Sequence, residues 1–254
     1  MLKMFPFAGR LNYQTKPMET TFLQHIKKRA GQLIEPALLK QGRVLEVRSW
    51  EPSTMIEIDL HLPTADMSHW ADVPYVKFRV DGLTFRDYTP SGWDADTHTC
   101  TLYIDAAHKG PGSNWARSLQ KNDTVQYLKI DTTHHMPDPT NLVVGLGDQS
   151  SLGHFFGLQQ LVYPVTRFTG AVAMADDNHR SLFPEYFRSP LQPIANTDST
   201  GHERLMTWVG EQGFCADHTY FYLAGNHNMV SGLRKSLREE GFHSGHIKVK
   251  GFWS

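Results

Sequence analysis

Apolar and polar residues alternate with a period of two through the first half of the chain, from Gly42 to about Pro137. The alternation is clearest in the runs 56–62, 75–85, 100–104 and 124–130. Successive side chains of a strand point to opposite faces, so this spacing predicts half-buried β-strands. Several short strands separated by Pro, Gly and Asp predict an antiparallel barrel or sandwich.

After a proline-containing segment, 134–139, short apolar runs alternate instead with helical patterns. The expected strands are 141–145, 165–173, 220–224 and 247–252. The expected helices are 152–161, 203–211 and 229–237, the last ending before Gly241. Strands that alternate with helices predict a parallel α/β sheet.

The beginning of the chain follows neither pattern. Residues 20–34 place apolar side chains at helical spacing with Lys27, Lys28 and Arg29 opposite them,. We interpret this helix as packed on the body of the protein, with a basic membrane-surface segment as the alternative. The predicted organisation is an N-terminal helical extension over 1–38, a β-domain over 39–137 and an α/β domain over 138–254.

Composition removes several classes of function. The chain has 254 residues and a formal net charge of -1. Its overall charge would therefore not attract nucleic acid or an acidic membrane. The sequence contains no run of about 18 apolar residues, so no membrane span is predicted. Two cysteines are too few for an iron–sulfur cluster and indicate a reducing compartment, so we expect a cytoplasmic protein,. The 14 histidines show no metal-binding spacing, and no metal is predicted,.

The segment Arg86-Asp87-Tyr88-Thr89, at the end of the run 75–85, suits a flavin. Arginine offers a fork of donors for a phosphate or pyrophosphate. Two residues on, and on the same side of an extended chain, the tyrosine ring can lie against an isoalloxazine. The threonine hydroxyl can hydrogen-bond the reactive edge of that ring.

A glycine-rich segment follows about 20 residues later, at 104–116. Gly110, Gly112 and Ser113 lead into 115–119, which predicts a helix start. Free backbone amides at a helix N-terminus suit a pyrophosphate, and Ser113 is expected to cap the helix and contact that group. An ordinary capped loop is the alternative.

A second glycine cluster joins a strand to a helix at 143–153. It has Gly145 and Gly147 but Ser150 at the third glycine position of a dinucleotide fingerprint, so the match is degenerate. A similar junction lies at 223–228 and contains Gly225. Two such junctions in one parallel sheet would line a single cleft.

Together these segments resemble the siderophore-interacting proteins, flavin-dependent ferric-siderophore reductases of the ferredoxin–NADP reductase superfamily. The resemblance spans roughly residues 40–254. It rests on the motifs at 86–89, 108–116 and 147–152, and on the end of the chain, 224–225, 233–238 and 250–253. It implies an N-terminal antiparallel FAD-binding β-barrel followed by a C-terminal parallel α/β nucleotide-binding domain, a ferredoxin reductase-like fold.

The resemblance also implies a set of site residues. The expected cofactor-binding residues are Arg86, Asp87, Tyr88, Thr89, Asp105, His108, Gly112, Ser113, Trp115, Asp148, Ser150, Ser151 and Gly225. Among them, the residues of 108–115 would surround the FAD phosphates or adenine, and those of 148–151 the nicotinamide. Tyr88, Thr89 and Trp253 are expected at the reacting ring, and Lys248 and Lys250 at an anionic ferric siderophore.

The implied activity is transfer of electrons through FAD to a ferric siderophore, with release of Fe(II). Gln149, Ser151 and the segment 226–228 depart from the family pattern on the electron-donor side. NADH, NADPH and reduced ferredoxin therefore all remain as donors. The alternatives are a ferredoxin–NADP or flavin reductase with a protein or free-flavin acceptor, and a non-catalytic siderophore-binding module.

Overall fold

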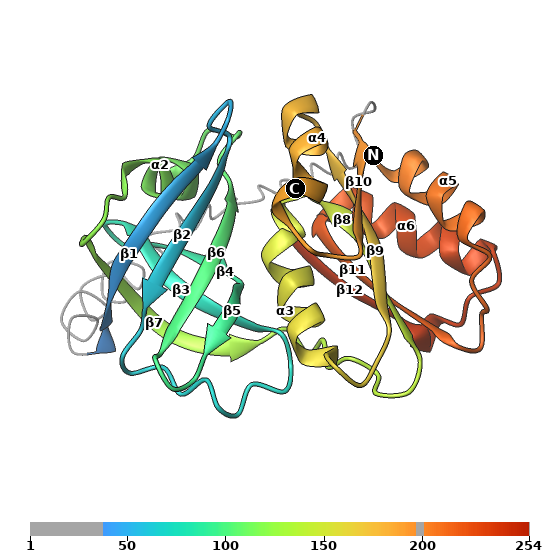
Figure 1. Cartoon of the computed structure of the whole chain (residues 1–254), viewed down its shortest axis with the longest axis horizontal. Coiled ribbons are helices and arrows are strands. Elements are labelled where there is room, and N and C mark those ends of the chain that lie inside the picture. The colour runs from blue at the N-terminus through green and yellow to red at the C-terminus, as the bar shows by residue number, and fades with distance from the viewer. Residues whose placement is uncertain (1–37, 197–200, 254) are drawn as a thin grey trace, which may run out of the picture. The chain divides into compact units, whose positions relative to one another are not determined.

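The computed structural model describes residues 38–196 and 201–253, in which two sheets follow one another along the chain (Figure 1). The first is antiparallel and has the order β4-β3-β7-β1-β2-β6-β5. Its strands are β1 Lys40–Trp50, β2 Met55–His61, β3 Pro74–Asp81, β4 Thr84–Tyr88, β5 Pro90–Asp94, β6 Thr99–Asp105 and β7 Thr124–Thr132. The helix α2, Pro111–Ser118, lies between β6 and β7.

The connection between β4 and β5 makes the first sheet curl into a barrel-like form. These strands are the two edges of the sheet order, yet Thr89 alone separates them in sequence. The edges must therefore meet, and the inward side chains fill the space they enclose. Phe78, Tyr127 and Leu102, for example, are fully buried there.

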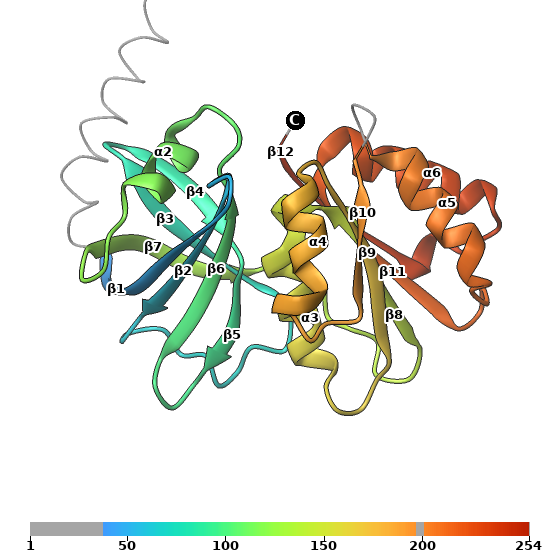
Figure 2. The same ribbon diagram turned by 45° about the horizontal axis from the view of Figure 1, so that its top comes forward.

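The second sheet is parallel throughout, in the order β10-β9-β8-β11-β12. Its strands are β8 Leu142–Asp148, β9 Phe168–Met174, β10 Leu191–Ala195, β11 Thr219–Asn226 and β12 Ile247–Trp253. Its helices are α3 Leu152–Val162, α4 Asp177–Tyr186, α5 His202–Gln212 and α6 His227–Glu239, with single turns η1 Gln149–Ser151 and η2 Ser244–His246. Helices α5 and α6 cover one face, and α3 and α4 the other (Figure 2). Each pair packs on the sheet through apolar side chains.

The strand order determines where this sheet can bind a ligand. The chain starts in the middle with β8, continues to β9 and β10 on one side, and then crosses to β11 and β12 on the other. Connections leave β8 and β11 in opposite directions, which opens a crevice between their carboxyl ends. Asp148 and Asn226 end these two strands, so they lie at that crevice.

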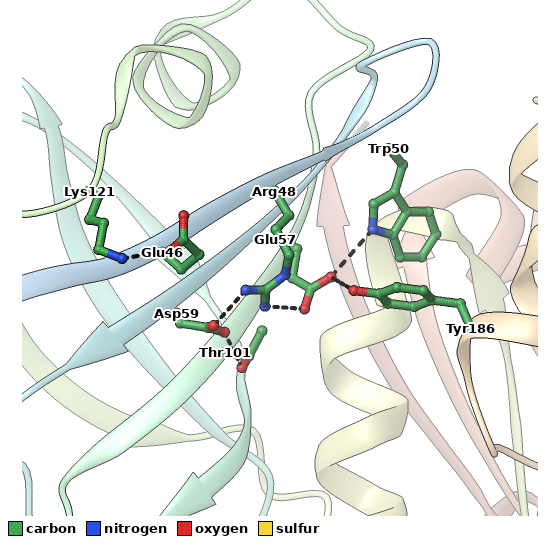
Figure 3. Close-up of polar contacts among 8 residues, drawn as sticks. All are labelled: Glu46, Arg48, Trp50, Glu57, Asp59, Thr101, Lys121 and Tyr186. Atoms are coloured by element: carbon green, nitrogen blue, oxygen red, sulfur yellow. Dashed lines mark hydrogen bonds and ion pairs between the residues drawn. The ribbon is translucent and has the colours of Figure 1, made fainter.

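Side chains also join the first sheet to two helices of the α/β region. The nearly buried carboxylate of Glu57 in β2 accepts from Arg48 at 2.5 Å and Trp50 at 3.4 Å, and from Tyr186 of α4 at 3.3 Å (Figure 3). At another contact, the amide of Gln160 in α3 pairs with the backbone N–H and carbonyl of Trp93, at 3.1 and 2.8 Å. The chain from Lys40 onward accordingly forms one compact unit.

The predicted fold class is confirmed: an antiparallel β-region is followed by a parallel α/β sheet. Two local predictions are corrected. The run 75–85 is a hairpin, since the chain turns at Gly82 (φ +42°) between β3 and β4. The helix expected to start at Trp115 begins at Pro111 and ends at Ser118. The helix expected at 20–34 lies outside the described residues.

Candidate functional site

A pocket of about 430 Å³ opens where the end of the barrel meets the crevice of the parallel sheet. Its walls come from β4 and Thr89, the end of β6, the start of α2, the start of α3 and the end of β12. Ten of the predicted site residues line it: Arg86, Asp87, Tyr88, Thr89, Asp105, His108, Gly112, Ser113, Ser150 and Trp253. Segments up to 167 positions apart (Arg86 to Trp253) thus share one cavity.

Arg86 and Tyr88 lie on the same side of β4, as the extended spacing predicted,. The Arg86 guanidinium is exposed, donates to the carbonyl of Phe85 at 2.8 Å and makes no ion pair with any described residue. Burial raises the pKa of Tyr88 to about 12, while the charge of Arg86 acts in the opposite direction. The tyrosine therefore stays a neutral phenol, and Arg86 retains N–H groups for an anion.

Gly112 makes room for Tyr88 in the first turn of α2. A Cβ atom at this position would collide with the Tyr88 hydroxyl. The helix begins at Gly110 and Pro111, and no side chain caps it. Ser113 lies inside the helix, so the prediction that it caps the helix is wrong. The first-turn amides are left for a ligand, which is the arrangement that binds phosphate groups.

The end of β12 lines the pocket. The Trp253 indole N–H donates to Ser150 Oγ at 3.1 Å, and its ring lies 4.6 Å from that of His108. His108 Nε2 is 3.6 Å from the buried carboxylate of Asp105. Trp253 therefore contacts the turn η1 after β8 and one loop of the barrel region.

Asp148 holds the ends of β8 and β11 together through hydrogen bonds. Its carboxylate accepts from Ser150 Oγ at 2.5 Å, from Ser150 N at 3.0 Å and from Asn226 N at 2.8 Å. Burial raises its pKa, whereas the bonds from Ser150 and Asn226 lower it. Gly225, at φ +121°, lies so close that a Cβ would stand 2.7 Å from this carboxylate. Asp148 and Gly225 thus join the two strand ends rather than line the pocket.

Several predicted residues lie outside the pocket wall. Trp115 stacks on Tyr88 at 5.5 Å and 13°, so it supports the tyrosine ring from the core side. Ser151 is buried and donates to the carbonyl of Asp148 at 2.5 Å. Lys248 and Lys250 lie on β12, with Lys250 Nζ 5.2 Å from the ring centroid of Tyr75. Their predicted roles toward a ligand stay predictions.

The pocket also contains residues that the sequence patterns did not select: Tyr103, Gly153, His154 and Phe252. A Cβ on Gly153 would stand 2.8 Å from the carbonyl oxygen of Thr89, so this glycine lets α3 approach the β4–β5 junction. His154 follows it and is 1% exposed. The sequence could have indicated His154 because it is a histidine on the apolar face of a predicted helix, directly after a glycine-rich junction. Lys109 also lines the wall.

These residues fit the diphosphate part of a flavin dinucleotide. The wall offers an exposed guanidinium without an ion-pair partner among the described residues and an uncapped helix N-terminus. Both present N–H donors, which suit a pyrophosphate. Among the described residues, no group of three or more His, Cys, Asp or Glu side chains is placed to hold a metal ion. Nor is any helix in residues 38–196 or 201–253 long and apolar enough to cross a bilayer.

The order of an antiparallel sheet and a parallel α/β sheet, with a pocket at the switch point, is that of a ferredoxin reductase-like fold. Among solved structures, a ferredoxin NADP+ reductase from Neisseria gonorrhoeae with bound FAD and NADP matches 84% of this chain and 98% of its own. The TM-score is 0.68 and the identity 13%.

The family that the motifs indicated is found in the same comparisons. The model described as siderophore-interacting protein matches residues 141–254. The siderophore-interacting protein of Acinetobacter baumannii matches 85% of this chain and 90% of its own, with TM-score 0.68 and 13% identity. A siderophore utilization protein from T. fusca matches 85% and 92%, with TM-score 0.66 and 20% identity. The predicted resemblance is therefore confirmed. A comparison with curated proteins gave no match.

Proposed function

We propose that this protein is an FAD-dependent oxidoreductase that takes electrons from NADH, NADPH or reduced ferredoxin and reduces a ferric siderophore to release Fe(II). The observation that carries the proposal is the shared pocket, which brings Arg86, Tyr88 and Gly112 of the barrel region to Ser150 and Trp253 of the parallel sheet. When bound, FAD would convert a two-electron donation into one-electron reductions of Fe(III).

Each residue then has a role that its position supports. Arg86 and the first turn of α2 would bind the pyrophosphate, since both present N–H donors to the pocket,. Tyr88, supported by Trp115, would give the isoalloxazine a neutral and rigid aromatic surface,. Thr89 would contact the edge of the ring. Ser150, oriented by Asp148, would hold Trp253 at the entrance used by the donor.

The acceptor would be an anionic ferric chelate. Hard oxygen ligands hold Fe(III) more strongly than Fe(II), so reduction alone weakens the complex. Lys109 at the pocket wall, together with Lys248 and Lys250 of β12, is a cation that would attract such a chelate,. The two cysteines, both free, support a reducing and hence cytoplasmic location,.

The test starts from the purified protein. We expect it to carry or take up one FAD per chain, visible as flavin absorption, and Arg86→Ala to weaken FAD binding at least tenfold through loss of a charge-assisted contact. Arg234→Ala on the exposed face of α6 is the matched control and should bind FAD as the original protein does. A protein that binds no FAD would refute the proposal and leave the non-catalytic siderophore-binding module.

The acceptor is tested separately. The flavin-loaded protein is first reduced anaerobically with NADH, NADPH or reduced ferredoxin, which identifies the electron donor. Ferric chelates, ferredoxin or free flavin are then added to the reduced protein, which identifies the acceptor. Lys109→Ala and Lys250→Ala should raise the Michaelis constant for an anionic ferric chelate and reduce its salt dependence. Activity on ferredoxin or free flavin with none on iron chelates would favour the reductase alternatives.

A further inference from the structure

Two histidines from different segments form a buried pair beside the pocket. His135 Nδ1 and His154 Nε2 are 2.8 Å apart, with their rings nearly perpendicular at 80°. The two residues are 3% and 1% exposed. Burial lowers the pKa of His135 to about 4 and that of His154 well below 6.5, so both rings are neutral at physiological pH.

The surroundings determine which nitrogens carry the protons. His135 also hydrogen-bonds the backbone of Val249, an interaction that favours a proton on His135. Since its Nδ1 faces His154, the nitrogen left for the Val249 carbonyl is Nε2. A neutral imidazole has one N–H, so His135 Nδ1 is an acceptor and His154 Nε2 is its donor.

This assignment leaves an acceptor without a partner. His154 Nδ1 carries the lone pair, is closed to solvent and has no hydrogen-bond partner among the described residues. Buried acceptors are satisfied in most proteins, and exceptions occur where a ligand binds. His154 lines the proposed cofactor pocket together with Ser150 and Phe252.

The neighbours of His154 place it near the planar part of a ligand. Gly153 packs against the carbonyl of Thr89, at the β4–β5 junction that follows Tyr88. The Phe252 ring lies edge-on to the imidazole, with 5.8 Å between the ring centroids. Phe252 is 39% exposed, so its side chain can turn aside for a ligand.

We propose that His154 Nδ1 accepts a hydrogen bond from the amide-type N–H of a planar cofactor ring bound in this pocket, with His135 holding His154 in the tautomer that makes this possible. The inference rests on the proposed function. Two groups have this chemistry, the imide N–H of the isoalloxazine and the carboxamide of nicotinamide. His154 would thus be a positioning residue that selects rings with an N–H at that edge.

A double-mutant cycle tests the contact by ligand affinity, independently of turnover. The unmodified protein should bind FAD more tightly than 3-methyl-FAD, which lacks the imide N–H. His154→Leu should weaken FAD binding three- to tenfold, the effect of one hydrogen bond, and leave 3-methyl-FAD unchanged. His154→Asn, whose side-chain oxygen replaces Nδ1, should restore part of the preference.

Matched ligands distinguish the two sources of the N–H. NAD+ and its 3-acetylpyridine analogue, which lacks the carboxamide N–H, are compared in the same variants. A preference that depends on His154 in either ligand pair supports the proposal and identifies the ring. The same affinities for both members of both pairs, in the original protein and in His154→Leu, would overturn it while FAD binding itself sustains the proposed function.

Histidine 15N NMR provides a readout in the original protein, so the test does not depend on the variant folding. The free protein should show His154 Nδ1 without a proton, and its resonance should move with FAD and not with 3-methyl-FAD if the isoalloxazine is the donor. A protonated Nδ1 would contradict the assigned tautomer. His179→Leu is the control, because His179 is also buried without ring hydrogen bonds in the described structure but lies outside the pocket. It should bind FAD as the original protein does.

Discussion

Gly112 sets how closely the first turn of α2 approaches β4. Its missing side chain admits the Tyr88 hydroxyl, and Trp115 in the same helix covers one face of the Tyr88 ring. A single short helix therefore determines both the position and the support of the tyrosine. The conformation of Gly112 is ordinary, so its requirement comes from space and not from backbone strain,.

Gly112→Ala should weaken FAD binding about tenfold or more, because the added methyl group displaces Tyr88. FAD titration followed by fluorescence measures this. Gly210→Ala on the exposed side of α5 is the control, since a Cβ there meets nothing within 4 Å and the residue lies outside the pocket. Equal FAD affinities of Gly112→Ala and the original protein would show that the Tyr88 slot does not matter for the cofactor.

The buried pair His135–His154 should make the protein sensitive to acid. The unfolded histidine binds a proton below about 6.5, whereas folded His135 does so only near pH 4,. The unfolded state therefore binds more protons between these values, and stability falls as the pH falls from 6.5 to about 4. The loss should be on the order of 2–3 kcal/mol.

Urea unfolding across this pH range measures the effect. The double variant His135→Leu/His154→Leu should have a shallower decline, while replacement of the exposed His243 by Gln should keep the original profile. A double variant with the same pH dependence as the original protein would mean that other groups cause the acid sensitivity.

Helix α4 is connected to the barrel through β2. Tyr186 donates to Glu57, whose carboxylate also pairs with Arg48 in β1 (Figure 3). Hydrogen bonds with Asp59 and Glu57 raise the pKa of Arg48, so its guanidinium stays charged. Two strands of the first sheet and helix α4 of the α/β region thus meet at one side chain that is 6% exposed.

Glu57→Gln should lower the free energy of unfolding by about 2 kcal/mol, since it removes the charge that Arg48 and Tyr186 contact in a nearly buried position. Urea unfolding measures the change. Glu46→Gln is the matched control, because the Glu46–Lys121 pair, 2.9 Å apart, is largely exposed and its loss should leave the unfolding midpoint nearly unchanged,. Equal unfolding curves for the two variants would contradict the connecting role of Glu57.

The accessibility of the two cysteine thiols measures whether the folded protein opens, because one thiol is buried and the other is exposed. Cys100 is buried in the barrel core, and burial raises its pKa to about 12, whereas Cys215 is exposed. A thiol reagent should therefore modify one thiol in the native protein and the second only when the barrel opens. Ellman's reagent with and without denaturant measures this. Rapid reaction of both thiols in the native protein would show that the barrel core is accessible.

Local patterns predicted the strands and helices that repeat a regular period. The two prolines at 184 and 193 concealed α4 and β10, since both residues argue against regular structure,. The structure accommodates Pro193 because β10 is an edge strand. The turn at Gly82 was hidden because alternation continues through the short β3–β4 hairpin.

By itself the sequence determined the order of the two sheets, the side of β4 that carries Arg86 and Tyr88, and the glycine-rich segment before α2. These follow from local geometry, since period and φ/ψ preference act within a few residues. Only the tertiary structure decided that Trp253 bonds Ser150, that His154 pairs with His135 and that Glu57 meets Tyr186. Such pairs depend on packing between segments that no local pattern relates, so the lone pair of His154 could be found only in three dimensions.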